Sequence, residues 1–188
     1  MMRKVAIGKH PYIYPVPTVL LGATADEKVN FSTIGNCGII SVHPPIVYAS
    51  SDKSHFTNKG IREHGVFSLN IPSTANLVKT DYCGLVSGAE VDKSNLFKVF
   101  YESNNFVPMI EECTVNISCS VFKTIEIFHM EMFIAEIVES FIDESCLVDG
   151  KPNIKAIDPI IYSIKGNYWN IGEEIGNAFS DGKRYESG

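Results

Sequence analysis

The sequence predicts a mainly β protein, an antiparallel barrel with short peripheral helices. Its apolar segments repeatedly have the two-residue period of strands, and the segments that look helical are few and short. Strands and helices do not alternate at a fixed length along the chain. A doubly wound parallel sheet is therefore disfavoured, and an antiparallel barrel is favoured.

Short strands are predicted at 18–24, 46–51 and 66–71, which are rich in branched or aromatic residues and are bounded by Pro, Gly, Asn or Asp. A longer strand is predicted over 115–127, because apolar and mostly polar residues alternate there, as in a strand with one buried face. Its apolar positions are Val115, Ile117, Cys119, Val121, Ile125 and Ile127.

The following segment, 129–142, has apolar residues at both odd and even positions, and so on both faces of a predicted strand. This pattern predicts a strand that is buried on both sides for part of its length, at an interface between subunits. Helices are predicted at 53–65, which ends at a glycine, and at 73–84, which begins with hydroxyl caps and also ends at a glycine.

Composition limits the class of protein. The 188 residues, 45% hydrophobic and 20% charged, are typical of one soluble globular domain, which we expect to span 1–188. The net charge of −6 and the lack of a Lys/Arg cluster argue against a nucleic-acid partner. The N-terminal segment resembles neither a signal peptide nor a membrane span, so we expect a cytoplasmic protein. The five cysteines include no CxxC pair, and neither a disulfide framework nor a zinc site is expected.

One stretch between two apolar segments, residues 30–41, is unusually rich in small polar residues and glycine. A plain connection between neighbouring strands needs only a few residues. We therefore expect a long loop whose backbone and hydroxyl groups are arranged for a ligand. The residues concerned are Ser32, Thr33, Gly35, Asn36, Gly38 and Ser41.

An anion site is suggested by residues 49–61, where a predicted strand runs into the start of a predicted helix. Hydroxyl groups, free backbone N–H groups, a positive helix end and a lysine together suit a phosphate. The alternative is that Ser51 or Ser54 caps the helix and that Lys53 is solvated. The residues at this junction are Ser50, Ser51, Lys53, Ser54 and Thr57.

Two further polar residues have an open interpretation. Lys93 is either a second cation for the same anion or a solvated surface charge. His129 is either a hydrogen-bond donor or a structural residue. The sequence contains no GxGxxG, GxxxxGK[ST] or HExxH motif, and no nucleophile triad, carboxylate pair or metal-ligand cluster stands out.

Four segments taken together resemble the flavin reductase-like family of FMN-binding split barrels, and most closely its flavoredoxin branch. They begin with "PVPTVLLG", "KSHFTNKG", "TDYCGLVSG" and "HMEMFIAE", and cover residues 15–50, 53–73, 80–97 and 129–163. The sequence departs from the family in two places. Some members have a tryptophan where this chain reads "TIGNCG", and Ala135 stands where a glycine is usual.

The resemblance implies a homodimer of split antiparallel barrels with one FMN per subunit at or near the interface. It implies that the flavin ring and ribityl chain are lined by Asn30, Ser32, Thr33, Ile34 and Asn36. It also implies that the phosphate is held by Ser50, Ser51, Lys53 and Thr57, with added charge from Lys93, and that His129 and Tyr162 lie near the flavin.

The function implied is the transfer of electrons from NAD(P)H, or from a redox protein, through bound FMN to an acceptor. No catalytic side chain is then required, because the flavin carries the chemistry. The alternatives are an electron carrier that does not oxidise NAD(P)H, a flavin-storage module, and a barrel without cofactor. The segment around Tyr168 and Trp169 either covers the flavin or the partner subunit, or closes the barrel.

Overall fold

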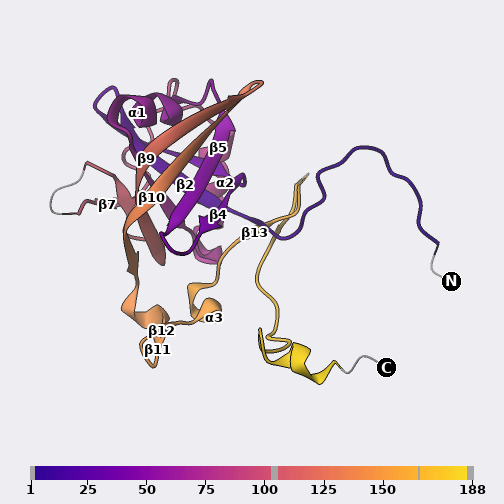
Figure 1. Ribbon diagram of the computed structural model, residues 1–188. Coiled ribbons are helices and arrows are strands. Elements are labelled where there is room, and N and C mark those ends of the chain that lie inside the picture. The colour runs from indigo at the N-terminus through magenta and orange to yellow at the C-terminus, as the bar shows by residue number, and fades with distance from the viewer. Residues whose placement is uncertain (1–2, 103–105, 165, 186–188) are drawn as a thin grey trace.

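The computed structural model describes residues 3–102, 106–164 and 166–185. Within these residues the main sheet has seven antiparallel strands (Figure 1). In chain order they are β2 (Val19–Ala25), β3 (Lys28–Ile34), β4 (Cys37–Ser41), β5 (Ile46–Asp52), β6 (Val66–Ile71), β9 (Val115–Ile127) and β10 (Met130–Ile142). Across the sheet the order is β3-β2-β6-β9-β10-β5-β4. The predicted antiparallel, mainly β fold is confirmed.

Smaller elements surround this sheet. The helices are α1 (Phe56–His64), α2 (Leu77–Leu85) and α3 (Ile154–Ile157), with 3-10 turns at Thr74–Asn76, Glu144–Cys146 and Asp181–Arg184. The short strands are β1 (Val16–Pro17), β7 (Val99–Phe100), β8 (Met109–Ile110), β11 (Leu147–Val148), β12 (Lys151–Pro152), β13 (Ile161–Tyr162) and β14 (Tyr168–Trp169). Within the described ranges, no helix is long and apolar enough to cross a membrane.

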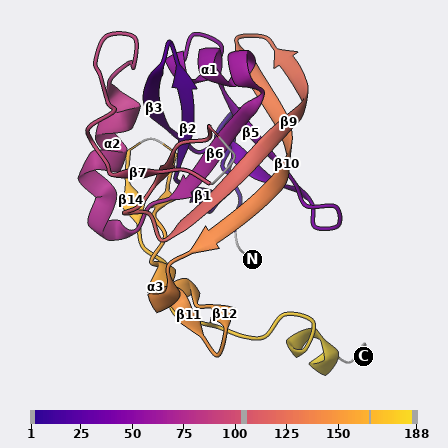
Figure 2. The ribbon, with the colours of Figure 1, turned by 90° about the vertical axis from the view of Figure 1, so that its left-hand side faces the viewer.

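Strand β2 is buried on both faces, which explains its nearly continuous apolar sequence. Val19 and Leu21 point into a core that also contains Phe67 and Phe133 from β6 and β10. Leu20 belongs to a second core, which continues into α2 and the segment around residues 97–113. The two cores lie on opposite faces of β2 and hold both helices against the same sheet. Helix α1 lies at one end of the sheet and α2 along one side (Figure 2).

The stretch 30–41 differs from the predicted loop. Residues 28–34 form β3, which pairs with β2, and residues 37–41 form β4, which pairs with β5. The small polar side chains therefore lie on strands, and the connection between β3 and β4 is only residues 35–36. Pairing with β2 and β5 outweighs the low strand propensity of these small polar residues.

The helix boundaries also differ from the sequence-based prediction. The predicted helix 53–65 begins only at Phe56, after an N-cap at His55 that has no side-chain cap hydrogen bond, so neither Ser51 nor Ser54 is the cap. The Ser54 hydroxyl instead donates to the Asp52 carboxylate over 2.7 Å. The predicted helix 73–84 consists of a 3-10 turn followed by α2, which continues past Gly84 to Leu85.

The long strand β9 packs its apolar face against the first core, and at its start it also buries the opposite, polar face. At its start, Asn116 and Ser118 are buried, whereas Ile117 is only half-buried. The Asn116 amide donates to Asn70 Oδ1 over 2.8 Å and to the Ile110 carbonyl over 2.9 Å. The predicted apolar face is confirmed at Ile117, Cys119 and Val121, which pack on the first core. The opposite face is not exposed at the start of the strand, because the segment containing β8 covers it with hydrogen-bond partners.

Segments from the two ends of the chain meet beside α2. Strand β13 pairs with β1 on one side and with β14 on the other. The N-terminal residues before β1 and the residues after β14 extend away from the barrel (Figure 1). The short three-stranded sheet thus forms a wall next to β3 and α2.

Candidate functional site

A polar pocket of about 250 Å³ lies between β3, the start of α1, and the end of α2 with the loop that follows it. It is lined by hydroxyl, amide, imidazole and ammonium groups, and by the backbone around Gly84 and Gly88. A concave site with a few converging polar groups is typical of a small-molecule site. We call it the polar pocket.

Lys93 places a buried positive charge in the polar pocket. Lys93 is only 2% exposed, and its Nζ donates to the carbonyl of Phe31 over 2.8 Å and to that of Cys83 over 3.1 Å. Burial lowers the pKa of Lys93, and among the described residues no carboxylate forms an ion pair with it. A buried charge without a counterion is costly. An ammonium has three N–H donors, so one remains for an anionic ligand.

The N-terminus of α1 faces the same pocket through His55, Phe56 and Thr57. The first N–H groups of a helix and its positive end attract anions. The Thr57 hydroxyl oxygen accepts from the Asn30 amide over 2.6 Å, so the Thr57 hydroxyl proton is available to a ligand. Burial lowers the pKa of His55 and outweighs the opposing effect of the Asp52 carboxylate, while Lys93 adds a smaller lowering effect. The imidazole is therefore a neutral partner near pH 7.

Two buried polar atoms of the polar pocket have no partner within the described part of the chain. They are Oδ1 of Asn30 and Oγ of Ser32, on residues that are 2% and 6% exposed. Because buried polar atoms are nearly always hydrogen-bonded in proteins, both atoms indicate a ligand that completes the site.

Gly88 is required by the close packing of this pocket. A Cβ atom at this position would lie 2.0 Å from Asn30 Oδ1 and 2.9 Å from Phe56 Cδ1. The loop after α2 can therefore approach β3 and α1 only with a glycine here.

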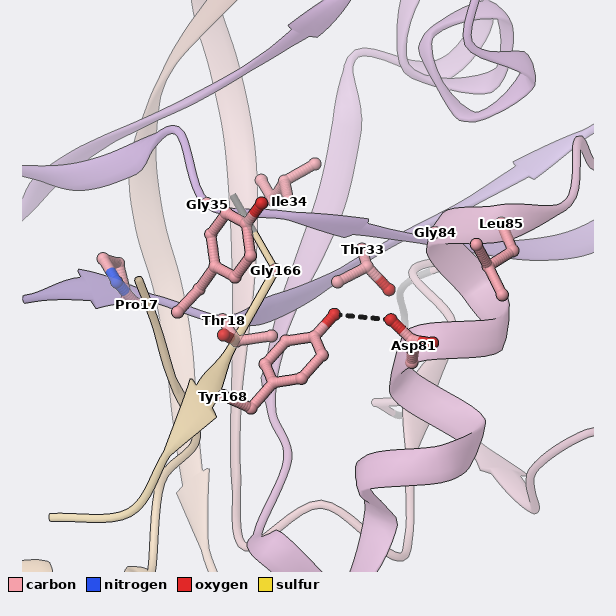
Figure 3. A pocket seen from close by; sticks show the side chains of 11 residues that line it. Pro17, Thr18, Thr33, Ile34, Gly35, Asp81, Gly84, Leu85, Gly166 and Tyr168 are labelled. Carbon is pink, nitrogen blue, oxygen red and sulfur yellow. Dashed lines mark hydrogen bonds between the residues drawn. The ribbon is translucent and has the colours of Figure 1, made fainter. Parts of the chain in front are cut away.

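A second pocket, of about 320 Å³, adjoins the first and shares Thr33, Gly84 and Leu85 with it. Its walls include the aromatic rings of Tyr162 and Tyr168. We call it the aromatic pocket. Figure 3 shows Tyr168 reaching from β14 toward α2.

In the aromatic pocket the Tyr168 hydroxyl donates to Asp81 Oδ1 over 2.8 Å (Figure 3). Burial and this hydrogen bond raise the pKa of Tyr168 to about 12. The phenol therefore keeps its proton at neutral pH. On the same wall, the buried Thr18 Oγ1 has no partner among the described residues. The aromatic pocket thus combines apolar walls with a few directed polar groups.

The structure brings together seven of the residues predicted for the site. Five line the polar pocket, namely Asn30, Ser32, Thr33, Thr57 and Lys93. Ile34 and Tyr162, together with Thr33, line the aromatic pocket. The interpretation of Lys93 as a solvated surface charge was wrong, because this lysine is buried.

The other five predicted residues lie outside both pockets. Asn36 accepts a backbone hydrogen bond from Ser50 over 2.8 Å, and the Ser51 hydroxyl donates to Asn58 over 2.6 Å. Lys53 forms an ion pair with Glu126 on the β9–β10 hairpin. His129 is exposed in the turn of that hairpin. The side chains of Ser51 and Lys53 thus bind other side chains of the protein and not the pocket.

Several pocket residues were not predicted. Ser54 lies in the predicted anion segment, but His55, Phe56, Ser87 and Gly88 were not singled out. His55 and Phe56 could have been found from their position at the start of a predicted helix. No side chain caps the N–H groups there, so these groups are available to a ligand. For Ser87 and Gly88 the signal is the "SG" pair after α2, which is typical of a tight turn. Asp81 and Tyr168 meet only through the tertiary fold.

Comparison with known proteins identifies the family. The model of the flavin reductase like domain matches residues 12–159. The chain belongs to this family. A protein of Archaeoglobus fulgidus is 30% identical over 155 residues, which are 81% of this chain and 86% of that protein.

Solved structures of similar proteins share the fold of this chain. The flavoredoxin of Methanosarcina acetivorans has 42% identity and a TM-score of 0.93, and the match covers 97% of this chain and 98% of that one. The flavoredoxin of Desulfovibrio vulgaris (Miyazaki F) has 33% identity and a TM-score of 0.90, with 96% and 100% covered. The FMN-binding protein of Thermus thermophilus, with 23% identity and a TM-score of 0.79 over 94% and 99%, shares the fold.

Proposed function

We propose that this flavin reductase-like protein binds FMN in the joined pockets and uses it to move electrons from NAD(P)H, or from a redox protein, to an acceptor. The observation that carries the proposal is the buried Lys93 ammonium, which has no carboxylate partner in the described ranges and lies beside the N-terminus of α1. This arrangement suits the phosphate of a cofactor.

The donors and the shape of the joined pockets fit FMN. Lys93, Thr57 and the first N–H groups of α1 would hold the phosphate, and Asn30 Oδ1 and Ser32 Oγ would meet the hydroxyls of the ribityl chain. The aromatic pocket offers the rings of Tyr162 and Tyr168 and apolar side chains such as Ile34 and Leu85 to the flavin ring. Together the two volumes fall within the range of roughly 300–1,000 Å³ that is common for ligand sites.

When bound, the flavin supplies reversible two-electron chemistry, and the protein contributes binding, orientation and electrostatics. By holding the charged end, the residues of the polar pocket would orient the ring toward the aromatic pocket. Burial of Asn30 and Lys93 keeps water from competing for the same hydrogen bonds. No general acid or base is required of the side chains.

A second candidate function is an electron carrier that receives electrons from a redox protein and does not oxidise NAD(P)H. The similarity to two flavoredoxins, at 42% and 33% identity over nearly the full chain, supports this alternative. Both candidates use the same FMN site, and they differ in the donor.

We also propose a homodimer and a single domain that spans the chain. Ile39 and Ile40 on the edge strand β4, and Val42 just after it, are 74%, 51% and 66% exposed. Apolar side chains clustered at a sheet edge favour contact with a second copy. The C-terminal residues that follow the family match return to the barrel through the pairing of β13 with β1, which supports one domain.

The test is the visible absorption spectrum of the purified protein, recorded with added FMN and then with NADH or NADPH in the absence of oxygen. A yellow protein that is bleached by a nicotinamide supports the reductase. A yellow protein that is bleached only by dithionite supports the carrier. A protein that remains colourless and does not bind FMN overturns the proposal.

A further inference from the structure

The aromatic pocket contains a carboxylate that the binding of a phosphate does not use. Asp81 lies on α2, and its Oδ1 accepts the hydrogen bond from Tyr168. No ion pair joins Asp81 to a cation among the described residues. The carboxylate therefore adds a negative charge to the wall of a pocket whose lining is otherwise uncharged.

The two charges of the joined site are separated along its length. Lys93 belongs to the polar pocket and Asp81 to the aromatic pocket, and neither residue lines both. The residues shared by the two pockets, Thr33, Gly84 and Leu85, carry no charge. A ligand that spans the site thus has its anionic end at Lys93 and its ring end near Asp81.

Tyr168 fixes the position of the carboxylate. Its ring packs against Tyr162 with 5.7 Å between ring centroids, and its hydroxyl reaches Asp81 across the pocket (Figure 3). The phenol keeps its proton at neutral pH because burial and the bond to Asp81 raise its pKa to about 12. Tyr168 is therefore a neutral donor that orients Asp81 and partly compensates its charge.

We propose that Asp81, oriented by Tyr168, makes the aromatic pocket bind the uncharged oxidised flavin ring more tightly than the reduced ring, and so lowers the reduction potential of the bound cofactor. This inference rests on the proposed function. Reduction adds two electrons and one proton at neutral pH, so the reduced ring carries a negative charge. A fixed carboxylate beside it disfavours that charge.

The consequence is a cofactor that is poised to donate electrons. Two electrons arrive as a hydride from NAD(P)H, which is oxidised to NAD(P)⁺, and they leave to an acceptor that is reduced. Lowering the potential makes the second transfer more favourable at the expense of the first. Asp81 thus sets the direction in which the site works best.

The test is the midpoint potential of bound FMN, measured anaerobically against a reference dye during reduction by dithionite. We expect Asp81→Asn to change the ratio of the affinities for oxidised and reduced FMN by about tenfold, which for two electrons corresponds to about 30 mV. The potential should rise. Glu111→Gln is the matched control, because it removes the same charge from an exposed position that lines neither pocket, and it should leave the potential unchanged.

Tyr168→Phe tests the positioning role. It removes the hydroxyl that compensates Asp81 and retains the ring, so the potential should fall in the wild-type background. It should have no effect in the Asp81→Asn background, because Tyr168 acts through Asp81. Equal effects in both backgrounds would contradict this role.

The outcomes separate this inference from the proposed function. If FMN binds and both Asp81→Asn and Glu111→Gln leave its potential unchanged, the inference about Asp81 is wrong and the FMN site stands. If the wild-type protein does not bind FMN, the proposed function is wrong. Affinities for oxidised FMN, measured by calorimetry on the same variants, show whether the folded site is retained.

Discussion

At the scale of single residues, Lys93 connects ligand binding with stability. Its ammonium donates to two carbonyls, and no carboxylate in the described part of the chain neutralises it. Such a group stabilises a bound anion and is a cost to the empty protein. The same residue should therefore influence both the affinity for the cofactor and the pH dependence of folding.

The pH dependence of stability should show the buried state of Lys93. Burial lowers its pKa below the ordinary value of 10.5. Between the lowered pKa and 10.5 the unfolded chain binds more protons than the folded chain, so the free energy of unfolding rises with pH across that window. We expect this rise in urea denaturation of the apoprotein, and its loss in Lys93→Met. Parallel pH profiles for the two proteins would show that the lysine is not buried as described.

Gly88 should not tolerate even one added methyl group. In Gly88→Ala the new Cβ would meet the buried Asn30, which in turn positions Thr57. We expect a loss of about 1–3 kcal/mol in unfolding free energy, as for other overpacked sites, with weaker FMN binding. Gly172→Ala is the control, because a Cβ there meets nothing within 4 Å. Denaturation and FMN titration of both variants check this, and a variant with native affinity would refute the tight packing at Gly88.

At the scale of elements, α1 is anchored to the sheet by a buried polar network. Asn58 donates to Glu131 Oε2 over 3.1 Å and accepts from Ser51 over 2.6 Å, while Arg62 donates to the same carboxylate over 2.6 Å. Glu131 is 4% exposed. The network fixes α1 against β5 and β10, and so positions the N-terminus of the helix at the polar pocket.

Weakening this anchor should affect both folding and binding. Glu131→Gln removes the charge and one acceptor, and we expect it to cost about 1–3 kcal/mol of unfolding free energy. Glu63→Gln, which affects an exposed ion pair with Lys59, should cost less than about 1 kcal/mol. Urea denaturation measures the two costs. FMN titration of Glu131→Gln should also show weaker binding, and a wild-type affinity would mean that the anchor does not position the site.

The sequence predicted the elements better than it predicted their ends. Strand β6 has the predicted bounds, because its apolar pattern is closed by Gly65 and Pro72. The stretch 30–41 was misjudged, since small polar residues at a binding site resemble those of a loop. Their strand conformation depends on pairing with β2 and β5, which are distant interactions that local composition does not record.

The site was predictable only in part for the same reason. Asn30 and Thr57 carry local signals, and the resemblance to a family linked them to Lys93. Lys53 was assigned to the phosphate because it lies near a helix start, yet its ammonium reaches the neighbouring hairpin and pairs with Glu126. The pairing of Asp81 with Tyr168, 87 residues apart, depends on where the C-terminal strands return to α2.

At the scale of the whole molecule, the exposed edge of the sheet favours a dimer. We expect sedimentation analysis to give the mass of two chains. Ile39→Lys should weaken the association by about 2 kcal/mol or more, because it places a charge within the apolar cluster on β4. Lys123→Ala, at an exposed position on β9, serves as the control. A wild-type protein that sediments as a monomer would contradict the proposed dimer.

The central claim is the orientation of FMN in the joined pockets, with its phosphate at Lys93 and its ring at Tyr168. The most direct measurement is a calorimetric titration of wild-type apoprotein and of Lys93→Met, each with FMN and with riboflavin, which lacks the phosphate. A charge-assisted contact is worth about 1.5–3 kcal/mol, so FMN affinity should fall roughly 10- to 150-fold while riboflavin affinity stays nearly unchanged. Lys53→Met should leave both unchanged. An equal loss for FMN and riboflavin in Lys93→Met, or no loss for either, would contradict the account.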